Sequence, residues 1–229
     1  MDALLLRACK AGVFGDLRVD DCGYIAVAGM CYCYGRPNAK LWSYLQGNYK
    51  NRIIVPMSDE WRRALDEHDP EYGTATRWAM RPTPLLSDTK HLMRLEEQLP
   101  KGYMLSSMGA ADVSRNPFGH GRQYKTPELF EREGVGCAVR LNEEIVSAAS
   151  SFITFRGEIE VDVATAPAHR RKGLARACTA GLMRRCALKG LVPHWDAQNH
   201  ASRALAEELG YELDHEYTVY VRAEYLHKL

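Results

Sequence analysis

The chain has 229 residues, of which 46% are hydrophobic and 26% charged, and its formal net charge is +1 at pH 7. This length is enough for one large domain or two small ones with a buried core. The near balance of charge argues against a nucleic-acid-binding surface spread over the whole molecule, so any basic patch must be local.

The N-terminal segment and the hydropathy of the chain bear on its location. Leu4, Leu5 and Leu6 form too short an apolar run for a signal peptide, and an acidic residue stands at position 2. No stretch approaches the roughly 20 apolar residues that a membrane span needs. We therefore expect a cytoplasmic protein that does not bind a membrane.

The cysteines are odd in number, and most of them stand among apolar residues. Cys31 and Cys33 flank Tyr32, so in a strand they would share a face. No second cysteine pair or histidine doublet completes a metal-binding set. We predict buried, reduced thiols, with no metal site and no structural disulfide.

Residues 1–85 are predicted to form a small α/β unit. Residues 22–34 are apolar, broken by glycine and strand-like. Ser58 is placed to cap a helix whose first turn is acidic. Turn residues recur from 67 to 84, which favours a boundary there and a second domain at 86–229.

The second domain is predicted to contain a mixed sheet. A threonine–proline–glutamate sequence at 126–128 predicts a helix start. The segment 114–124 reads as a loop, in which His120 stands between two glycines and is expected to be solvated. Ser87 is expected to cap a helix, and strands are predicted at 103–106, 136–141, 145–155, 159–165, 191–199 and 216–221. The order β-β-β-α-β-α-β predicts an α/β (α+β) fold with helices on both faces of the sheet.

The stretch Glu158–Gly190 is predicted to form a strand, a basic loop and a helix. Acidic and β-branched residues alternate at its start, which is the pattern of a strand with two unlike faces. Gly190 stands where a left-handed residue commonly ends a helix. One apolar stripe of this helix consists of Leu174, Cys178, Gly181, Leu182 and Cys186.

The basic loop before this helix is a candidate phosphate site. The first N–H groups of a helix lack intrahelical partners and attract anions, and Gly173 lets an anion approach the backbone. Arg170, Arg171 and Lys172 stand directly before that glycine. Taken alone, the motif fits a phosphate site and an ordinary solvated loop equally well.

Two sequence blocks break this tie. Residues 165–175 read TAPAHRRKGLA, and residues 195–211 read WDAQNHASRALAEELGY. These blocks resemble the V-x-P-x-x-R-x-x-G-x-G/A and N-x-x-[AS]-x-x-L-x-x-x-x-G-[FY] patterns of the GNAT superfamily of acyl-CoA-dependent N-acetyltransferases. The second block looks most like a bacterial branch that includes the zwittermicin A resistance acetyltransferases. The resemblance covers residues 158–221 and implies a mostly antiparallel GNAT-like sheet, with residues 1–85 as an extra, substrate-side unit.

The resemblance implies acetyl-CoA as cosubstrate and no metal. The loop and helix start would hold the pyrophosphate, and the preceding strand would pair with the pantetheine arm. Asn199 and Ser202 would contact that arm from its far side. The implied binding set is Val163, Ala164, Thr165, Arg170, Arg171, Lys172, Gly173, Leu174, Ala175, Arg176, Asn199 and Ser202.

Acetylation of an amine needs a group that takes a proton from the ammonium. Glu158, Glu160 and Asp162 share a face of the predicted strand, and a row of carboxylates repels itself, which favours protonation of at least one of them. The same row fits the solvated face of a strand, but a central strand favours function. We predict that Glu160 or Asp162 is the base, acting directly or through water, and either could equally bind a cationic substrate.

One position departs from the family pattern. Many GNAT enzymes have a general-acid tyrosine seven residues after the asparagine, where this chain has Ala206. Tyr211, Tyr217 and Tyr220 follow nearby, and Tyr211 fits a core aromatic. His194 is expected to pack in its strand rather than act in catalysis. The role of general acid stays open.

The implied function is that of an acetyl-CoA-dependent N-acetyltransferase acting on a primary amine of a small molecule, such as an antibiotic or an amino-acid derivative. A protein lysine or N-terminus is the alternative acceptor. A non-catalytic acyl-CoA-binding regulator is the alternative from another class, and Ala206 is its only support. A small-molecule amine is the expected partner, without nucleic acid, and a homodimer is compatible with the sequence. Residues 1–85 and the loop 114–124 would select the acceptor.

Overall fold

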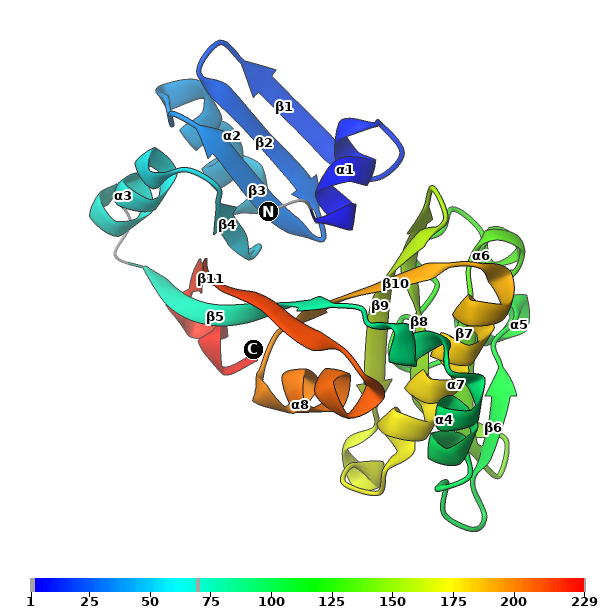
Figure 1. The fold of residues 1–229 in the computed structure, drawn as a ribbon. Helices are drawn as coiled ribbons and strands as arrows, with labels where there is room; N and C mark the ends of the chain where they lie inside the picture. Colours follow the sequence, from blue (N-terminus) through cyan, green and yellow to red (C-terminus); the bar gives the residue numbers. More distant parts are fainter. Residues whose placement is uncertain (1–2, 69–70, 229) are drawn as a thin grey trace. The chain divides into compact units, whose positions relative to one another are not determined.

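The structure is a computed structural model that describes residues 3–68 and 71–228 (Figure 1). The chain divides into two compact units. One comprises the residues up to Trp78 together with those from Glu216 onward, and the other comprises Ala79–His215. The strands β5 (Tyr72–Arg81) and β11 (Glu212–Arg222) have residues in both ranges.

The sheet of the first unit has the order β1-β2-β3-β4-β11. β1 pairs antiparallel with β2 and β2 with β3, whereas β3 and β4 are parallel. The strand-like segment 22–34 forms two of these strands, because the chain turns at Gly29 with a φ of 75°. The bounds are β1 Asp16–Asp20, β2 Gly23–Ala28, β3 Met30–Gly35 and β4 Ile54–Pro56.

The helices of the first unit are α1 (Leu4–Lys10), α2 (Ala39–Tyr49) and α3 (Asp59–His68). The Ser58 hydroxyl accepts a hydrogen bond from the Trp61 amide at 3.5 Å, which confirms the predicted start of α3. Cys31 and Cys33 face the same core, as the strand pattern predicted. That core contains Ile25, Val27, Cys31, Cys33, Leu41, Leu45, Ile54, Trp61, Leu65 and Tyr220.

The segment 67–84 does not consist of turns as expected, because β5 occupies Tyr72–Arg81. Turn residues precede and follow this strand, whereas the strand itself begins with a tyrosine and contains threonines and a tryptophan, which favour extended backbone. The Trp78 indole is buried and donates a hydrogen bond to the Glu216 carboxylate at 2.7 Å. The contact joins β5 to β11 within the first unit.

The strands of the second unit have the order β10-β9-β8-β7-β6. β9 and β10 are parallel, and the other neighbours in this series are antiparallel. Asn142 and Glu143 have φ values of 48° and 70° in the tight turn that separates β7 from β8. The bounds are β6 Met104–Ser107, β7 Gly136–Leu141, β8 Glu144–Phe155, β9 Glu158–Thr165 and β10 Val192–Ala197.

Helices lie on both faces of this sheet, which confirms the predicted architecture (Figure 1). On one face α7 packs against α4 and the strands, and its Cys178 thiol donates to the Cys137 carbonyl at 3.1 Å. On the other face, Val113 of α5 and Phe130 of α6 pack with Ala148 of β8. The bounds are α4 Thr89–Glu96, α5 Ala110–Arg115, α6 Pro127–Glu133, α7 Leu174–Lys189 and α8 His200–Leu209.

The predicted stripe of α7 is buried, but burial extends beyond it. Ala177, Thr179, Ala180 and Met183 are also buried, so this helix is covered around more of its circumference than an amphipathic surface helix would be. The Arg184 guanidinium binds both oxygens of Glu96 on α4, at 2.6 and 3.0 Å. Packing on two sides therefore holds α7 in place.

The helix caps show where local sequence was informative. The Thr126 hydroxyl caps α6 as predicted, accepting from the Leu129 amide at 3.1 Å. Asp88 rather than Ser87 caps α4, because Ser87 belongs to the short 3-10 helix Pro84–Ser87. α5 ends at Arg115, so it includes the first two residues of the segment 114–124 that the sequence predicts to be a loop.

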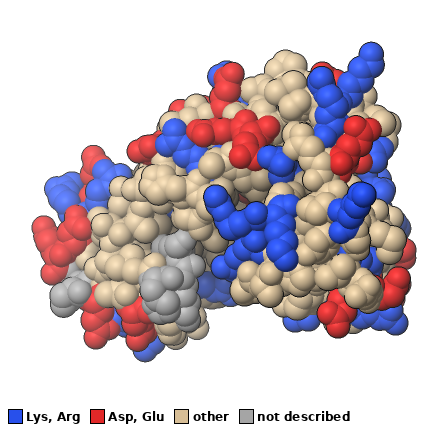
Figure 2. All heavy atoms as spheres, turned by 90° about the horizontal axis from the view of Figure 1, so that it is seen from below, with Lys and Arg blue, Asp and Glu red and all other residues tan. Residues whose placement is uncertain are grey.

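Six of the seven cysteines are buried, and all seven are free thiols. Burial raises the pKa of the Cys137 thiol to about 11. On the face that Figure 2 shows, Lys and Arg lie among Asp and Glu, in keeping with the small net charge. Within residues 3–68 and 71–228, no helix combines the length and the apolar character that crossing a membrane requires.

Candidate functional site

The carboxylate row lies on β9, between β8 and β10 in the second unit. Asp162 pairs with Ser150 of β8, and the neighbouring pair Val163–Ala149 belongs to the opposite face. α7 covers the face that contains Val163 and Ala149. Its Cys178 thiol bonds the carbonyl of Cys137, which pairs with Ala149 in the sheet. Glu158, Glu160 and Asp162 therefore lie on the face covered by α5 and α6, and all three are half-buried.

The strands β9 and β10 pair along only part of their length. Their parallel ladder joins Glu158 to Val192 and ends where Glu160 meets His194. The edge of β9 from Val161 to Thr165 that would face β10 is not used by this ladder, and these residues are half-buried. An extended ligand could take the place of the missing strand pairing there.

The basic loop has the backbone of an anion site. Arg171 has a φ of 64° and Gly173 a φ of 76°, so two left-handed residues precede the 16-residue helix α7. Such a turn points successive N–H groups into one concavity, next to the positive end of the helix dipole. A Cβ on Gly173 would lie 3.4 Å from the Arg176 guanidinium, so backbone conformation rather than crowding requires glycine here.

The basic side chains around this loop make different contacts. The Arg170 Nε donates to the Thr165 carbonyl at 3.2 Å, which returns that side chain to the end of β9. Lys172 donates to the Tyr103 hydroxyl at 3.3 Å. The Arg176 Nε is buried and has no hydrogen-bond partner in the described part of the chain. The Nη1 of the same guanidinium lies 3.4 Å from a Glu208 carboxylate oxygen on α8.

The residues predicted to contact a ligand from the far side start α8. The Asn199 side-chain oxygen accepts from the Ser202 amide at 2.9 Å and caps this helix. The Ser202 hydroxyl accepts from the Trp195 indole at 3.1 Å. Tyr211 is confirmed as a core aromatic, because it is buried and donates to the Pro193 carbonyl at 3.1 Å.

The structure shows where the positions considered for a general acid lie in the fold. Ala206 is buried within α8, and burial holds the pKa of Tyr211 well above its usual value. Tyr217 and Tyr220 belong to the first unit, where Tyr220 donates to Asp66 at 2.7 Å.

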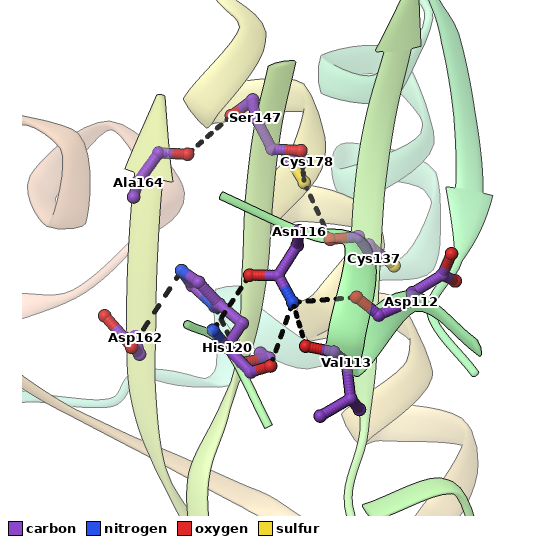
Figure 3. Close-up of polar contacts among 10 residues, drawn as sticks. Asp112, Val113, Asn116, His120, Cys137, Ser147, Asp162, Ala164 and Cys178 are labelled. Atoms are coloured by element: carbon purple, nitrogen blue, oxygen red, sulfur yellow. Dashed lines mark hydrogen bonds and ion pairs between the residues drawn. The ribbon is translucent and has the colours of Figure 1, made fainter. Parts of the chain in front are cut away.

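His120 is not the solvated histidine that was expected. Its side chain is 1% exposed, with Nδ1 at 2.8 Å from the Ser150 hydroxyl and Nε2 at 3.9 Å from an Asp162 carboxylate oxygen (Figure 3). Gly121, with a φ of 81°, packs so closely that a Cβ would come within 2.9 Å of Val113. A glycine there lets the loop lie flat on α5 and α6, which turns the histidine inward.

Asn116 anchors this loop from within. Its amide nitrogen donates to the carbonyls of Asp112, Val113 and His120, at 2.8, 3.2 and 3.1 Å (Figure 3). Its oxygen accepts from the His120 amide at 2.9 Å. The sequence contains one hint of this arrangement, which is an asparagine four residues before a histidine that lies between two glycines. This pattern does not predict that the histidine contacts Ser150 and Asp162.

A second histidine meets the other end of the carboxylate row. His194 Nε2 lies 2.5 Å from a Glu158 carboxylate oxygen, so it does more than pack in β10. The described residues contain no group of three or more metal-ligating side chains poised around a common point. The row thus has an imidazole near each of its ends.

Comparisons with known proteins show which family and fold this chain resembles. The family model described as GNAT acetyltransferase matches residues 2–220. The uncharacterized N-acetyltransferase YdfB of Bacillus subtilis is 28% identical over 65% of the chain, and the match spans 64% of that relative, less than two thirds of its length. A GCN5-related N-acetyltransferase-like protein from Streptococcus suis superposes with a TM-score of 0.86 at 29% identity, covering 96% of this chain and 93% of that one.

A GCN5-related N-acetyltransferase from Kribbella flavida shares the fold, with a TM-score of 0.58 at 14% identity over 100% of both chains. The predicted fold class, a mixed and largely antiparallel sheet with helices on both faces, is confirmed by these structures.

Proposed function

The chain belongs to the GNAT acetyltransferase family, and on this premise we propose that it transfers the acetyl group of acetyl-CoA to a primary amine of a small molecule. The observation that carries this proposal is the half-buried carboxylate row on β9, which runs from the paired to the unpaired part of the strand. A row of carboxylates attracts an ammonium and supplies an acceptor for its proton.

The residues around the loop fit acetyl-CoA. The left-handed residues Arg171 and Gly173 shape the start of α7 for a pyrophosphate, and Arg176 adds a positive charge in the first turn of that helix. The edge of β9 from Val161 to Thr165 suits an extended amide-bearing arm. When bound, this cosubstrate supplies an activated acyl group with a thiolate leaving group.

The base is proposed among the carboxylates that are not bonded to His194. Glu158 is 22% exposed and lies 2.5 Å from that imidazole, which occupies one of its oxygens. Asp162 is 37% exposed and lies beyond the end of the β9–β10 ladder. Asp162 therefore has both a solvent-accessible carboxylate and a position near the unpaired edge, and Glu160 is the neighbouring candidate.

The acceptor is proposed to be an antibiotic-like or amino-acid-like amine. The support is the resemblance of residues 195–211 to the zwittermicin A resistance branch and the acidic character of the row. The loop 114–124 lies over that row through His120, so it is placed to contact the acceptor.

Two measurements test this proposal. Calorimetric titration with acetyl-CoA is expected to show binding, and thiol release with a panel of small amines is expected to show turnover, with the acetylated product identified by mass spectrometry. A lysine peptide and an N-terminal peptide serve as comparison acceptors.

Turnover of the peptides alone would move the acceptor to the protein class. Binding without turnover on any amine would favour the regulator over the enzyme. Failure to bind acetyl-CoA would overturn the proposal.

A further inference from the structure

The described residues place one buried imidazole against the exposed end of the carboxylate row. We propose that His120 is a positioning residue that directs an Nε2 hydrogen towards Asp162 and fixes the orientation of that carboxylate for the incoming amine. The geometry behind this is the chain of contacts Ser150–His120–Asp162, in which Ser150 and Asp162 are cross-strand neighbours on β8 and β9. This inference rests on the proposed function, and it assigns a role in the reaction to His120, which the proposed function leaves without one.

The partners of the two ring nitrogens select the tautomer. An ionised carboxylate accepts hydrogen bonds and cannot donate one, so a hydrogen bond from His120 to Asp162 requires the hydrogen to be on Nε2. Nδ1 is then the acceptor, and the Ser150 hydroxyl, which can rotate, donates to it across 2.8 Å. Because this hydroxyl can donate as well as accept, Ser150 accommodates the tautomer that presents Nε2–H to the carboxylate.

The separation of 3.9 Å between Nε2 and the Asp162 oxygen is longer than a direct hydrogen bond. Catalytic contacts are often long before the substrate binds and shorten in the reactive complex. Asp162 is 37% exposed, whereas the imidazole is held by the loop, so the carboxylate is the partner that moves.

A neutral imidazole suits this task better than a cationic one. Burial lowers the pKa of His120, and the charge of Asp162 opposes this only in part. A neutral donor orients the carboxylate without placing a positive charge beside the ammonium that is to bind there.

The surrounding loop keeps the imidazole in one place. Asn116 bonds both the amide and the carbonyl of His120, and the Phe118 ring packs edge-on at 6.0 Å between centroids. Displacing a reacting group by about 1 Å can cost around 100-fold in rate, so a rigid mount for the base has a direct kinetic value.

Two substitutions separate the functions of the two ring nitrogens. His120→Gln can bring an amide N–H close to the position of Nε2, whereas His120→Asn can place its amide only near Nδ1. With an amine that the wild type acetylates, at saturating acetyl-CoA, we expect kcat to fall about 10- to 100-fold in His120→Asn and much less in His120→Gln. The KM for acetyl-CoA is expected to stay unchanged in both.

A purely structural role predicts another pattern, in which both variants lose thermal stability and activity in parallel. Wild-type kcat in both variants, or an equal loss in both, would overturn the inference. If the wild type acetylates no amine, the proposed function fails. The tautomer of His120, which can be measured without turnover, still tests the contact between His120 and Asp162.

Long-range ¹H–¹⁵N NMR spectra of the full chain report that tautomer without turnover. The His120 signals are assigned by their absence from the spectrum of His120→Gln. A protonated Nε2 with an unprotonated Nδ1 is expected in the wild type, and a protonated Nδ1 with a bare Nε2 would overturn the inference.

Discussion

At each end of the carboxylate row on β9, a carboxylate faces an imidazole, but the two pairs differ in distance and in burial. At the first end, Glu158 and His194 lie 2.5 Å apart where β9 and β10 are paired. At the other end, Asp162 and His120 lie 3.9 Å apart beyond the end of that ladder. The histidine is partly exposed in the first pair and buried in the second.

This difference shows how one strand can hold both a closed contact and an open one. Strand pairing brings Glu158 and His194 within hydrogen-bond reach, so each satisfies the other. Where the strands part, the imidazole comes from a loop, and the carboxylate keeps a solvent-accessible oxygen. An acidic row that looks uniform in the sequence is thus divided by its neighbours into an end that is bonded to a histidine and an end that keeps solvent access.

The sharpest test of this comparison removes one carboxylate at a time. Asp162→Asn is expected to lower kcat by about 10²- to 10⁴-fold, the range for losing a general base. Glu158→Gln is expected to lower it far less, because that carboxylate is already engaged by His194. Steady-state thiol release checks both, with Glu160→Gln assayed alongside. An equal loss in Glu158→Gln and Asp162→Asn would contradict the division of the row.

A matched pair of glycines tests the proposed acetyl-CoA site at the start of α7. Gly173 and Gly190 are left-handed residues at the two ends of this helix, with φ values of 76° and 66°. Gly173→Glu is expected to raise the acetyl-CoA Kd by at least about 10-fold, or 1.4 kcal/mol, because it adds a negative charge to the phosphate site.

The control, Gly190→Glu, carries the same left-handed strain of about 1–2 kcal/mol but should leave this Kd unchanged. Calorimetry gives both constants, and thermal unfolding verifies that the two variants lose similar stability. An unaltered Kd in Gly173→Glu would show that the loop does not hold the cosubstrate.

The hydrogen bonds by which Asn116 holds the His120 loop can be removed without changing the imidazole itself. Asn116→Ala removes four hydrogen bonds and leaves buried backbone groups unpaired, so the free energy of unfolding should fall by about 1–3 kcal/mol. The control is Asn48→Ala, which loses one bond on an exposed helix surface and should change stability by less than about 0.5 kcal/mol. Urea denaturation followed by circular dichroism compares them. Equal stabilities would mean that Asn116 does not hold the loop.

The smallest expected effect is a pH dependence of stability. Burial lowers the pKa of His120 below its usual value of 6.5, so below that pH the unfolded chain binds a proton that the folded chain refuses. The stability of the wild type relative to His120→Gln should therefore fall as the pH drops below about 6.5, by up to about 1.4 kcal/mol per unit. Denaturation curves between pH 7.5 and about 5 measure this difference. If the stability of the wild type relative to His120→Gln rose as the pH fell, the sign would be opposite to the expected one. That result would contradict a buried, neutral imidazole.

Much of the second unit follows from local sequence. The strand of alternating acids, the helix stripe after it, the Thr126 cap and the left-handed Gly190 all lie where their patterns predicted. These features depend on residues within a few positions of one another, and capping and strand alternation act over that range. The predicted fold class followed from the order of these elements.

Other features depend on contacts that local patterns do not record. The strand β5 was hidden by the turn residues around it, and the full burial of α7 depends on the elements that pack against it. His120 lies 30 residues from Ser150 in the chain, and its loop appeared solvated because its own residues are polar and glycine-rich.

The sequence by itself determined that this protein has three carboxylates on one face of a strand, followed by a loop suited to an anion. Only the tertiary structure decided which of them is bonded and which stays open, because that depends on where β10 leaves β9 and where the loop 114–124 lands. Backbone preferences act locally, whereas a buried imidazole and a carboxylate meet only when the helices and strands that carry them have packed.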